Sequence, residues 1–254
     1  MPMRADLYLV EHGYFETRAK AQAAIAAGKV AVDGVRLGKP SQKIAEGARI
    51  VAEAAHPWVS RAALKLVAGL DGFGVDPAGR VCLDVGASTG GFTQVLLSRG
   101  ARHVYAVDVG RDQLHSSLQA DARVSSMEGT DARSLAAEAF CEPPSLIVCD
   151  ASFISLLKLL PPVLALAADT ADLIALIKPQ FEVGRAAIGK RGLVKSREDR
   201  ERAVRAISSG LEGLAGFSVR AVMDSPIEGG DGNREYLIAA SRIRQSGKVE
   251  MPQV

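Results

Sequence analysis

Four charged residues stand out because their signs alternate and because three of them lie at the ends of predicted strands, with the fourth, Lys65, on a predicted helix. They are Lys65, Asp150, Lys178 and Glu235. Opposite charges gathered in one place orient amine groups, and a lysine that desolvation or a nearby cation makes neutral can act as a general base. A single charge at a strand end is often only a surface residue, but four such charges together predict an acid–base site. This chemistry requires neither a covalent intermediate nor a metal ion.

Residues 81–93 predict a ligand-binding turn between a strand and a helix. Residues 81–85 form a short apolar run typical of a buried parallel strand, and three glycines then allow a sharp turn. Such a turn brings bare backbone amides beside a ligand at the start of a helix. The alternative is a tight turn in an ordinary α/β protein. The candidate ligand contacts here are Asp84, Gly86, Ala87, Ser88, Gly90, Gly91, Phe92 and Thr93.

Carboxylates at the ends of later predicted strands add to this candidate site. Asp108 ends the next strand, where a doubly wound sheet binds a ribose diol. Asp131 could accept a hydrogen bond from the amine of an adenine, or it could cap the helix that follows. Asp150 belongs to both the acid–base set and the ligand-binding set.

Two cofactors fit this arrangement, a dinucleotide and S-adenosylmethionine. A dinucleotide-binding loop carries glycine where this chain has Ser88, because the pyrophosphate lies against the backbone there. Asp84 lies just before the loop, where it would repel a pyrophosphate and attract a cationic methionine group. We favour S-adenosylmethionine, and a dehydrogenase remains the alternative.

The order of predicted elements indicates an α/β, Rossmann-like fold. Strands and helices alternate after residue 80, which is typical of a mostly parallel sheet covered on both faces. A long helix starting near Ser196 precedes the last two strands, which are separated only by a loop and should pair antiparallel. Ligand-binding groups are then expected at the carboxyl ends of the strands. The seven expected strands are 81–85, 103–109, 124–128, 145–149, 172–177, 217–223 and 235–240.

A short linker separates this region from a smaller N-terminal unit. Pro57 favours extended backbone before it, and Trp58, the only tryptophan, should anchor the linker against one domain. Ser60 should cap a helix that starts at Arg61, and Lys65 on this helix could simply extend into solvent. We expect an N-terminal domain at 1–55, a linker at 56–60, a larger domain at 61–245 and a tail at 246–254.

Composition excludes several classes of protein. The 254 residues are 48% hydrophobic and 24% charged, which is ordinary for a soluble globular protein. No stretch is long and apolar enough to cross a bilayer, and the N-terminus has no signal-peptide core. The three cysteines have no metal-type spacing and indicate reduced thiols. We therefore expect a cytoplasmic protein without a metal site.

The net charge of +2 is too small to indicate nucleic-acid binding by itself. Residues 184–205 are different, because they hold eight Lys or Arg against three acids. This segment is a candidate surface for a polyanion, with Arg185, Lys190 and Arg191 as candidate contacts. A solvated helix face explains the part of this pattern after residue 198 equally well.

The N-terminal unit resembles the S4-type RNA-binding domain. Two helices, with a start signal at Thr17 and a stop at Gly28, precede a short strand and an Asp33-Gly34 turn. The resemblance covers nearly the whole unit, and the alternative is a helical cap for the larger domain. By this resemblance, Arg4, Arg18, Lys20, Gln22 and Lys29 would face RNA phosphates.

The order Lys65–Asp150–Lys178–Glu235 resembles the tetrad of FtsJ-like RNA ribose 2′-O-methyltransferases. Together with the S4-type unit, this tetrad makes residues 3–243 resemble the TlyA family of haemolysin A-type rRNA methyltransferases. The motifs that support the resemblance are residues 58–61, 84–93 and 177–182. The resemblance implies a sheet with an inserted antiparallel strand, S-adenosylmethionine as cofactor, and 2′-O-methylation of a cytidine in 23S rRNA of ribosomal subunits. Some members also modify 16S rRNA. It further implies that Lys178 is the general base and that Lys65, Asp150 and Glu235 position and polarise the reacting groups. Arg61 is then expected to lie toward the RNA.

Other functions remain as alternatives. An amine methyltransferase usually has two prolines after the fourth strand, where this chain has Ala151-Ser152. Carbon methylation of a pyrimidine needs a cysteine at a strand end, but Cys149 should point into the sheet. A membrane-active haemolysin lacks support from any spanning segment. An RNA-binding protein without methyl transfer would not need the tetrad.

Overall fold

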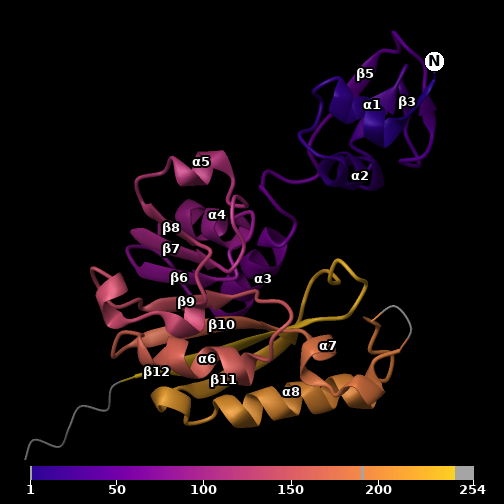
Figure 1. The fold of residues 1–254 in the computed structure, drawn as a ribbon. Coiled ribbons are helices and arrows are strands. Elements are labelled where there is room, and N and C mark those ends of the chain that lie inside the picture. The colour runs from indigo at the N-terminus through magenta and orange to yellow at the C-terminus, as the bar shows by residue number, and fades with distance from the viewer. Residues whose placement is uncertain (1, 190–191, 244–254) are drawn as a thin grey trace, which may run out of the picture. The chain divides into compact units, whose positions relative to one another are not determined.

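The computed structural model describes residues 2–189 and 192–243 of the protein (Figure 1). The chain forms two compact units, Met1–Pro57 and Trp58–Val254. Each unit is described by itself below.

The N-terminal unit packs two helices against two small sheets. The helices are α1 (Ala5–Glu11) and α2 (Arg18–Ala26); β1 (Met3–Arg4) pairs with β4 (Lys43–Ile44), and the second sheet has the order β3 (Val35–Arg36), β2 (Val30–Val32), β5 (Ile50–Ala52). The Thr17 hydroxyl accepts a hydrogen bond from Lys20 N and caps α2. Positive φ angles at Asp33 and Gly34 form the turn between β2 and β3. The predicted start signal and Asp-Gly turn are confirmed.

The larger unit is built on a seven-stranded sheet. Its strands are β6 (Val81–Val85), β7 (His103–Asp108), β8 (Val124–Glu128), β9 (Leu146–Cys149), β10 (Ala171–Ile177), β11 (Ser218–Asp224) and β12 (Tyr236–Arg242). They lie in the order β11-β12-β10-β9-β6-β7-β8, and β12 runs antiparallel to both of its neighbours. The predicted Rossmann-like fold with an inserted antiparallel strand is confirmed, and the strand bounds differ from prediction by at most two residues.

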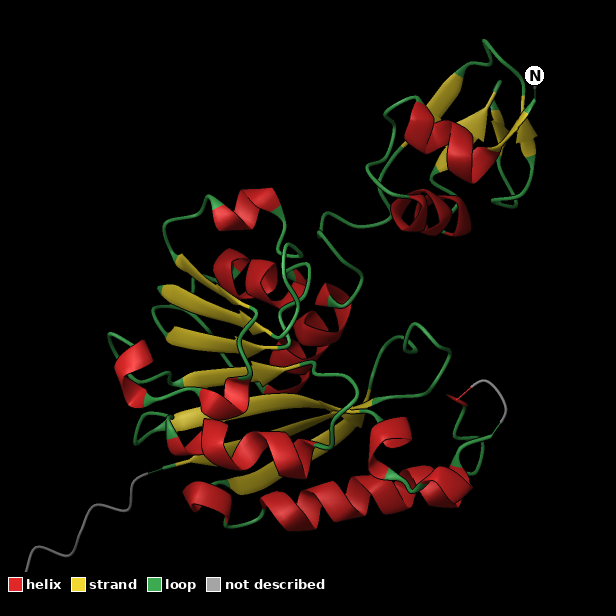
Figure 2. Ribbon diagram, in the orientation of Figure 1, coloured by secondary structure: helices red, strands yellow, loops and turns green. Residues whose placement is uncertain are grey.

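Helices cover both faces of this sheet (Figure 2). One apolar layer joins the sheet to α3 (Ala63–Phe73) and α4 (Gly91–Ser98), and the other joins it to α6 (Leu156–Ala165) and α8 (Arg197–Leu211). Branched aliphatic side chains make up most of both layers, as expected for parallel strands that are buried on both sides. The shorter helices are α5 (Ser116–Gln119), α7 (Pro179–Glu182), η1 (Ala132–Ser134), η2 (Ala137–Ala139), η3 (Arg185–Ala187) and η5 (Leu214–Gly216).

The start of α3 differs from the prediction. The helix begins at Ala63 rather than Arg61, and its N-cap residue makes no side-chain hydrogen bond. Ser60 therefore does not cap α3, and that prediction was wrong. Its hydroxyl instead lies beside Gly91, where an added Cβ would approach Ser60 Oγ to 2.3 Å. Trp58 packs against the apolar layer of α3 and α4, which confirms its predicted anchoring role.

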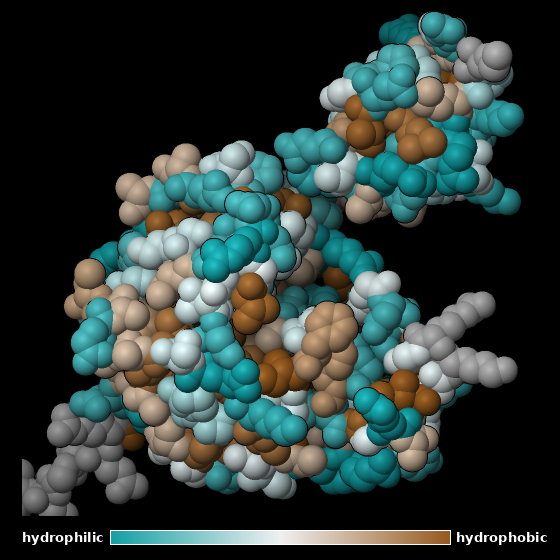
Figure 3. Space-filling model, viewed as in Figure 1, coloured by the Kyte–Doolittle hydropathy of each residue, from teal (hydrophilic) through white to brown (hydrophobic). Residues whose placement is uncertain are grey.

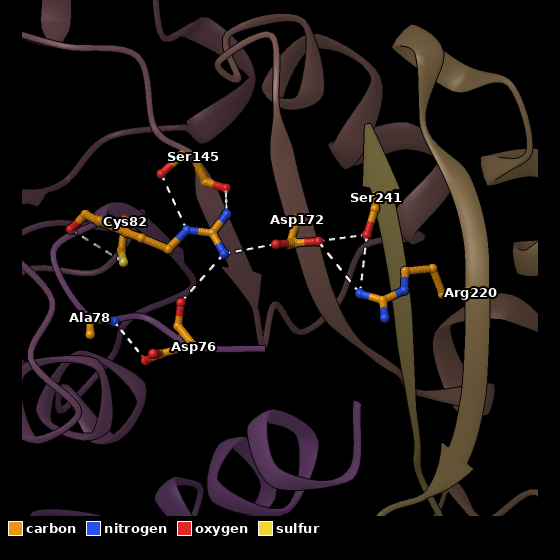
Figure 4. Close-up of polar contacts among 8 residues, drawn as sticks. Asp76, Ala78, Cys82, Ser145, Asp172, Arg220 and Ser241 are labelled. Atoms are coloured by element: carbon orange, nitrogen blue, oxygen red, sulfur yellow. Dashed lines mark hydrogen bonds and ion pairs between the residues drawn. The ribbon is translucent and has the colours of Figure 1, made fainter. Parts of the chain in front are cut away.

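Polar side chains connect the strands at the amino edge of the sheet (Figure 4). Arg80 precedes β6 and lies 2.7 Å from Asp172 on β10, and its guanidinium also donates to the side chain and carbonyl of Ser145 before β9. Ser241 on β12 donates to the other oxygen of Asp172, and Arg220 on β11 lies 3.8 Å from that oxygen. This amino-edge cluster links strands β10, β11 and β12 to the segments that enter β6 and β9.

The surface shown in Figure 3 carries its apolar residues in small areas separated by polar ones. Within residues 2–189 and 192–243, no helix has both the length and the apolar character needed to cross a membrane.

Candidate active site

The four charged residues predicted to act together form two ion pairs at the carboxyl edge of the sheet. Lys65 Nζ lies 2.5 Å from Glu235 Oε2, and Lys178 Nζ lies 2.7 Å from Asp150 Oδ1. The side chains of Lys65 and Glu235 are 7% and 3% exposed, and those of Lys178 and Asp150 are 9% and 13% exposed. A buried ion pair is costly to assemble and is retained where it has a structural or chemical role.

The sheet itself positions three of these residues. Asp150 directly follows β9 and Lys178 directly follows β10. In the antiparallel pairing of β10 with β12, Ile177 lies opposite Tyr236. Continuing this register by one residue places Glu235 beside Lys178, although the two are 57 positions apart in the sequence.

Close packing of α3 positions the fourth residue. A Cβ on Gly69 would lie 3.2 Å from Ile174 on β10, so the helix backbone approaches the sheet closely there. Lys65 lies one turn before Gly69, on the same face of the helix. Lys65 therefore points along the sheet toward its carboxyl edge. It is buried and does not extend into solvent, contrary to the simpler interpretation of its sequence.

Burial, charge and hydrogen bonds define the surroundings of Glu235 and Lys178. Burial raises the pKa of Glu235, and the charge of Lys65 opposes this effect. Lys178 Nζ also donates to Ser152 Oγ at 2.8 Å and to the carbonyl oxygen of Asp150 at 3.3 Å. The amine of Lys178 is thus held by a carboxylate, a hydroxyl and a carbonyl.

A cavity of about 520 Å³ lies at the ends of β6 and β7 and reaches the acid–base group at Asp150. Its lining includes Asp108, Asp131 and Asp150 but only one basic residue, Arg133, which is 2.6 Å from Asp131. Three carboxylates suit a cationic ligand with a ribose and disfavour a pyrophosphate. The volume lies within the range of cavities that bind small molecules. The residues therefore fit S-adenosylmethionine better than a dinucleotide.

Asp108 also shapes the glycine loop beside this cavity. Its carboxylate accepts hydrogen bonds from Ser88 N at 2.8 Å and Gly110 N at 2.7 Å. Ser88 has a φ of +47°, which is uncommon for a residue other than glycine, and this hydrogen bond stabilises it. Each carboxylate oxygen accepts one of these bonds and has the capacity for another, so Asp108 remains able to bind a ribose.

Contacts within the protein explain the glycines of this loop. A Cβ on Gly86 would approach the backbone of Ala151 to 3.0 Å, and one on Gly90 would meet Leu118 at 2.3 Å. Gly90 also has a φ of +91°. The sequence interpretation assigned these glycines to contact with a ligand, and Gly86 lines the 520 Å³ cavity. Close packing of the loop is a second reason for glycine at these positions.

Asp84 is fully buried beneath the loop and does not line the cavities described here. It accepts a hydrogen bond from the Thr93 hydroxyl at 2.7 Å, and its Oδ1 has no hydrogen-bond partner among the described residues. Burial raises the pKa of Asp84 to about 7, although the bond from Thr93 lowers it.

Ala87 and Phe92 line a smaller cavity of about 260 Å³, which also includes Lys178.

Asp131 has the structural role that the sequence left open. Its side chain accepts a hydrogen bond from Arg133 N and caps η1. It also lines the 520 Å³ cavity, so capping does not remove it from the candidate cofactor contacts.

A second cavity, of about 450 Å³, contains the amines and is called the substrate cavity below. It is lined by Lys65, Lys178 and Glu235 together with Phe153 and Phe181. The two aromatic rings lie 5.2 Å apart, and Phe153 is 91% exposed with a φ of +66°. Exposure and backbone strain in a bulky residue beside two cavities point to a role in binding. The sequence analysis missed Phe153, although its place three residues after a strand-end acid was a usable signal.

The residues predicted to bind RNA in the N-terminal unit are placed around one buried acid. Asp6 is fully buried and accepts hydrogen bonds from Arg4 at 3.0 Å, Arg18 at 2.9 Å and Gln22 at 2.7 Å. The bond from Arg4 holds the pKa of Asp6 well below its usual range. The two arginine side chains remain 45% and 53% exposed. They lie side by side and keep further N–H groups for other partners.

The other predicted RNA contacts are distributed over both units. Lys20 pairs with Glu16 and Lys29 pairs with Glu53. Arg61 lines the 260 Å³ cavity and Arg185 begins η3, while Lys190 and Arg191 lie outside the described residues. On α8, acids at 199 and 201 pair with arginines at 197, 202 and 205, as expected for a solvated helix face.

Rival chemistries receive little support from the geometry. Cys149 is fully buried in β9, and burial raises its pKa to about 12, so it is not an available nucleophile. In the part of the chain that is described, no group of three or more His, Cys, Asp or Glu could hold a metal ion.

Comparison with known proteins gives consistent matches to both units. A model of FtsJ-like methyltransferases matches residues 58–242, and a model of the S4 domain matches residues 3–50. The 16S/23S rRNA (cytidine-2′-O)-methyltransferase TlyA of Mycobacterium tuberculosis is 45% identical, over 92% of this chain and 88% of that protein. Hemolysin A of Brachyspira hyodysenteriae is 42% identical, over 92% of this chain and 98% of that protein. A solved structure from Streptococcus thermophilus, provisionally called a hemolysin, has a TM-score of 0.75 and 38% identity, covering 95% and 89% of the two chains.

Proposed function

The chain belongs to the TlyA family of FtsJ-like methyltransferases, and on this premise we propose that it methylates the ribose 2′-hydroxyl of a cytidine in ribosomal RNA with S-adenosylmethionine. Its M. tuberculosis relative carries this activity in its name. The N-terminal S4 domain supports an RNA substrate.

One observation carries the proposal. The 520 Å³ cavity lined by Asp108, Asp131 and Asp150, called the acidic cavity below, meets the substrate cavity at the Lys178–Asp150 pair. Asp150 lines the first cavity, Lys178 lines the second, and their charged groups are 2.7 Å apart. A methyl donor in the first cavity and a nucleotide in the second would therefore meet beside a potential base. Positioning of two reactants in this way is a large part of catalysis.

The residues of the acidic cavity would hold the cofactor. All three acids line this cavity: Asp108 would bind the ribose hydroxyls, Asp131 would accept from the amine of the adenine, and Asp150 would face the cationic end. Bound S-adenosylmethionine supplies a methyl group activated by a positively charged sulfur. Carboxylates along the cavity stabilise that charge before transfer.

Lys178 acts as the general base in this proposal. Its ammonium group first releases a proton to solvent, because only the neutral amine can accept another. The neutral amine then takes the proton of the 2′-hydroxyl as the oxygen forms its bond to the methyl carbon and the carbon–sulfur bond breaks. Asp150 stabilises the ammonium group that results, and Glu235 holds Lys65 in place.

The N-terminal unit would bind the phosphate backbone, with ribosomal subunits as the partner. Arg4 and Arg18 present adjacent exposed guanidinium groups, an arrangement suited to phosphate oxygens. Within the larger unit, Arg61 would add a positive charge to the cavity that includes Lys178. Phosphate contacts fix the orientation of a protein on RNA, while the site selects the nucleotide.

Mapping of the methyl group tests the proposal. The protein is incubated with isotopically labelled S-adenosylmethionine and separated small and large ribosomal subunits, and digested rRNA is analysed by mass spectrometry. We expect one labelled cytidine in 23S rRNA, or one in each of 23S and 16S rRNA, with the label on ribose. Label on a base, or no transfer to either subunit, would contradict the proposal.

A further inference from the structure

The substrate cavity has a polar wall that the proposed methyl transfer does not use. This wall is formed by Gln180, on the short helix α7, and Asp231, in a glycine-rich loop at residues 229–232. Asp231 is exposed, whereas Gln180 is 9% exposed and the neighbouring Asn233 is 3% exposed. An accessible carboxylate is thus supported from behind by two buried amides.

Hydrogen bonds fix the orientation of the Asp231 carboxylate. Its Oδ1 accepts from Asn233 N at 3.0 Å, and its Oδ2 accepts from Asn233 Nδ2 at 2.8 Å and from Gln180 Nε2 at 3.2 Å. Asn233 in turn accepts from Val194 N and donates to the carbonyl oxygen of Gly192. Burial acts to raise the pKa of Asp231, but the bonds from Asn233 outweigh it and the pKa is lowered. The carboxylate is therefore ionised and can only accept hydrogen bonds.

This arrangement also determines which way the Gln180 amide points. Because an ionised carboxylate cannot donate, Gln180 must turn its nitrogen toward Asp231 and its oxygen away from it. Gln180 Oε1 is buried and has no hydrogen-bond partner among the described residues. A buried acceptor without a partner is unfavourable and uncommon in folded proteins. The accessible group of the wall is therefore the Asp231 carboxylate, which offers acceptors and no donor to a ligand.

We propose that Asp231, positioned by Gln180 and Asn233, recognises the exocyclic amine of the target base, which in the proposed cytidine substrate is N4 of cytosine. This inference rests on the proposed function, because it places the target nucleoside in the cavity of Lys178. Carboxylates accept hydrogen bonds from cytosine N4, whereas uracil has an acceptor, O4, at the same position. Phe153 and Phe181 line the same cavity and offer apolar rings to a flat base.

The consequence is discrimination against uridine. Uracil O4 would face a fixed negative charge and leave the acceptors of the wall without a donor. Sites that hydrogen-bond one polar group reject analogues lacking it by factors of about 10² to 10⁵. The native protein should therefore methylate cytidine at least about 100-fold faster than uridine at the same position.

The test uses reconstituted ribosomal subunits that carry either cytidine or uridine at the mapped position. Single-turnover rates of ribose methylation are measured for the native protein, Asp231→Asn and the control Glu228→Gln. Glu228 is an exposed acid near the same loop that does not line the substrate cavity. Asp231→Asn should slow methylation of cytidine by about tenfold or more and reduce the cytidine-to-uridine ratio below about 10, because an amide can donate to O4. Glu228→Gln should keep the native ratio.

A second variant, Gln180→Met, tests the same inference if Asp231→Asn does not fold. Gln180→Met removes both the support of Asp231 and the unpaired Oε1 at similar size, and it should also lower the ratio. Equal rates on the two substrates for the native protein, or an unchanged ratio in a folded Asp231→Asn protein, would overturn this inference while leaving the proposed function intact. Absence of ribose methylation on both substrates would instead refute the proposed function, and this inference with it.

Discussion

The two edges of the sheet in the larger unit both carry ion pairs, but they use different cations. At the amino edge, Arg80 and Arg220 flank Asp172, and serine side chains complete the hydrogen bonds (Figure 4). At the carboxyl edge, Lys65 and Lys178 pair with Glu235 and Asp150. A guanidinium group remains protonated in proteins, whereas an amine can lose its proton. The choice of cation therefore separates a structural cluster from one able to perform acid–base chemistry.

The surroundings of the two clusters differ in the same direction. The guanidinium of Arg80 is shared among Asp172, Ser145 and the carbonyl oxygen of Asp76, so its donors are used within the protein. The amines of the carboxyl edge line a cavity of about 450 Å³. The buried charges at the amino edge therefore join strands, whereas those at the carboxyl edge face a cavity large enough for a ligand.

The largest expected effect comes from changing the cation at the carboxyl edge. Lys178→Arg keeps the charge beside Asp150 but removes the ability to accept a proton. Methyl transfer should fall by about 10³-fold, since general bases contribute about 10² to 10⁴, while the melting temperature stays near the native value. Single-turnover transfer of labelled methyl groups measures the rate. A variant that retains a tenth of the native rate would show that proton acceptance by Lys178 is not needed.

Asp84, buried near the carboxyl edge, should make stability depend on pH. Its pKa is raised from 3.8 to about 7 in the folded protein, so between these values the unfolded chain is ionised while the folded protein keeps the proton. Native stability should therefore fall as pH rises from about 4 to 7, and Asp84→Asn should remove this loss. Between about pH 4 and pH 7, the unfolding free energy of Asp84→Asn should rise relative to that of the native protein by at most about 4 kcal/mol. Urea unfolding at several pH values measures it, and a difference that is constant with pH would contradict this assignment.

The complementary change at the amino edge should affect stability alone. Arg80→Lys keeps the charge beside Asp172 but loses the planar donors to Ser145. We expect a loss of about 1–3 kcal/mol in unfolding free energy, because the hydroxyl and the carbonyl of Ser145 each lose a part-buried hydrogen bond from the guanidinium, with methyl transfer within about twofold of native. Urea unfolding and single-turnover rates on the same preparation test this. If the methyl-transfer rate of Arg80→Lys fell while its unfolding free energy stayed native, the amino edge would not be purely structural, and the proposed difference between the two edges would be wrong.

The smallest effect is expected outside the larger unit. Arg18→Ala with Lys20→Ala should weaken binding to ribosomal RNA by about tenfold and reduce the salt dependence of affinity, because two phosphate contacts are lost. The transfer rate at saturating RNA should not change. Filter binding at several salt concentrations measures the affinity. Unchanged affinity would mean that this unit serves as a cap and does not bind RNA.

The order of strands and helices was predictable because its signals are local. Alternating apolar runs and glycine turns predict the parallel sheet, and the ends of those predicted strands place Asp150 and Lys178 at one edge of it. The Asp33-Gly34 turn and the Thr17 cap are equally local signals.

What the sequence could not predict depends on packing between distant elements. The pairing of Lys65 with Glu235 requires the close approach of α3 at Gly69, and Ser60 turned out to pack against Gly91. The exposure of Phe153 and the convergence of Arg4 and Arg18 on Asp6 likewise depend on tertiary contacts. Sequence alone assigned these arginines directly to phosphate and gave no role to Asp6.

The most direct test of the central claim is to measure methyl transfer and cofactor binding on the same Lys178→Ala protein. The account predicts a rate on ribosomal subunits reduced by about 10³-fold, with a dissociation constant for S-adenosylmethionine within about threefold of native. If cofactor affinity falls in parallel with the rate, Lys178 is a binding residue, and the role assigned to the carboxyl edge is wrong.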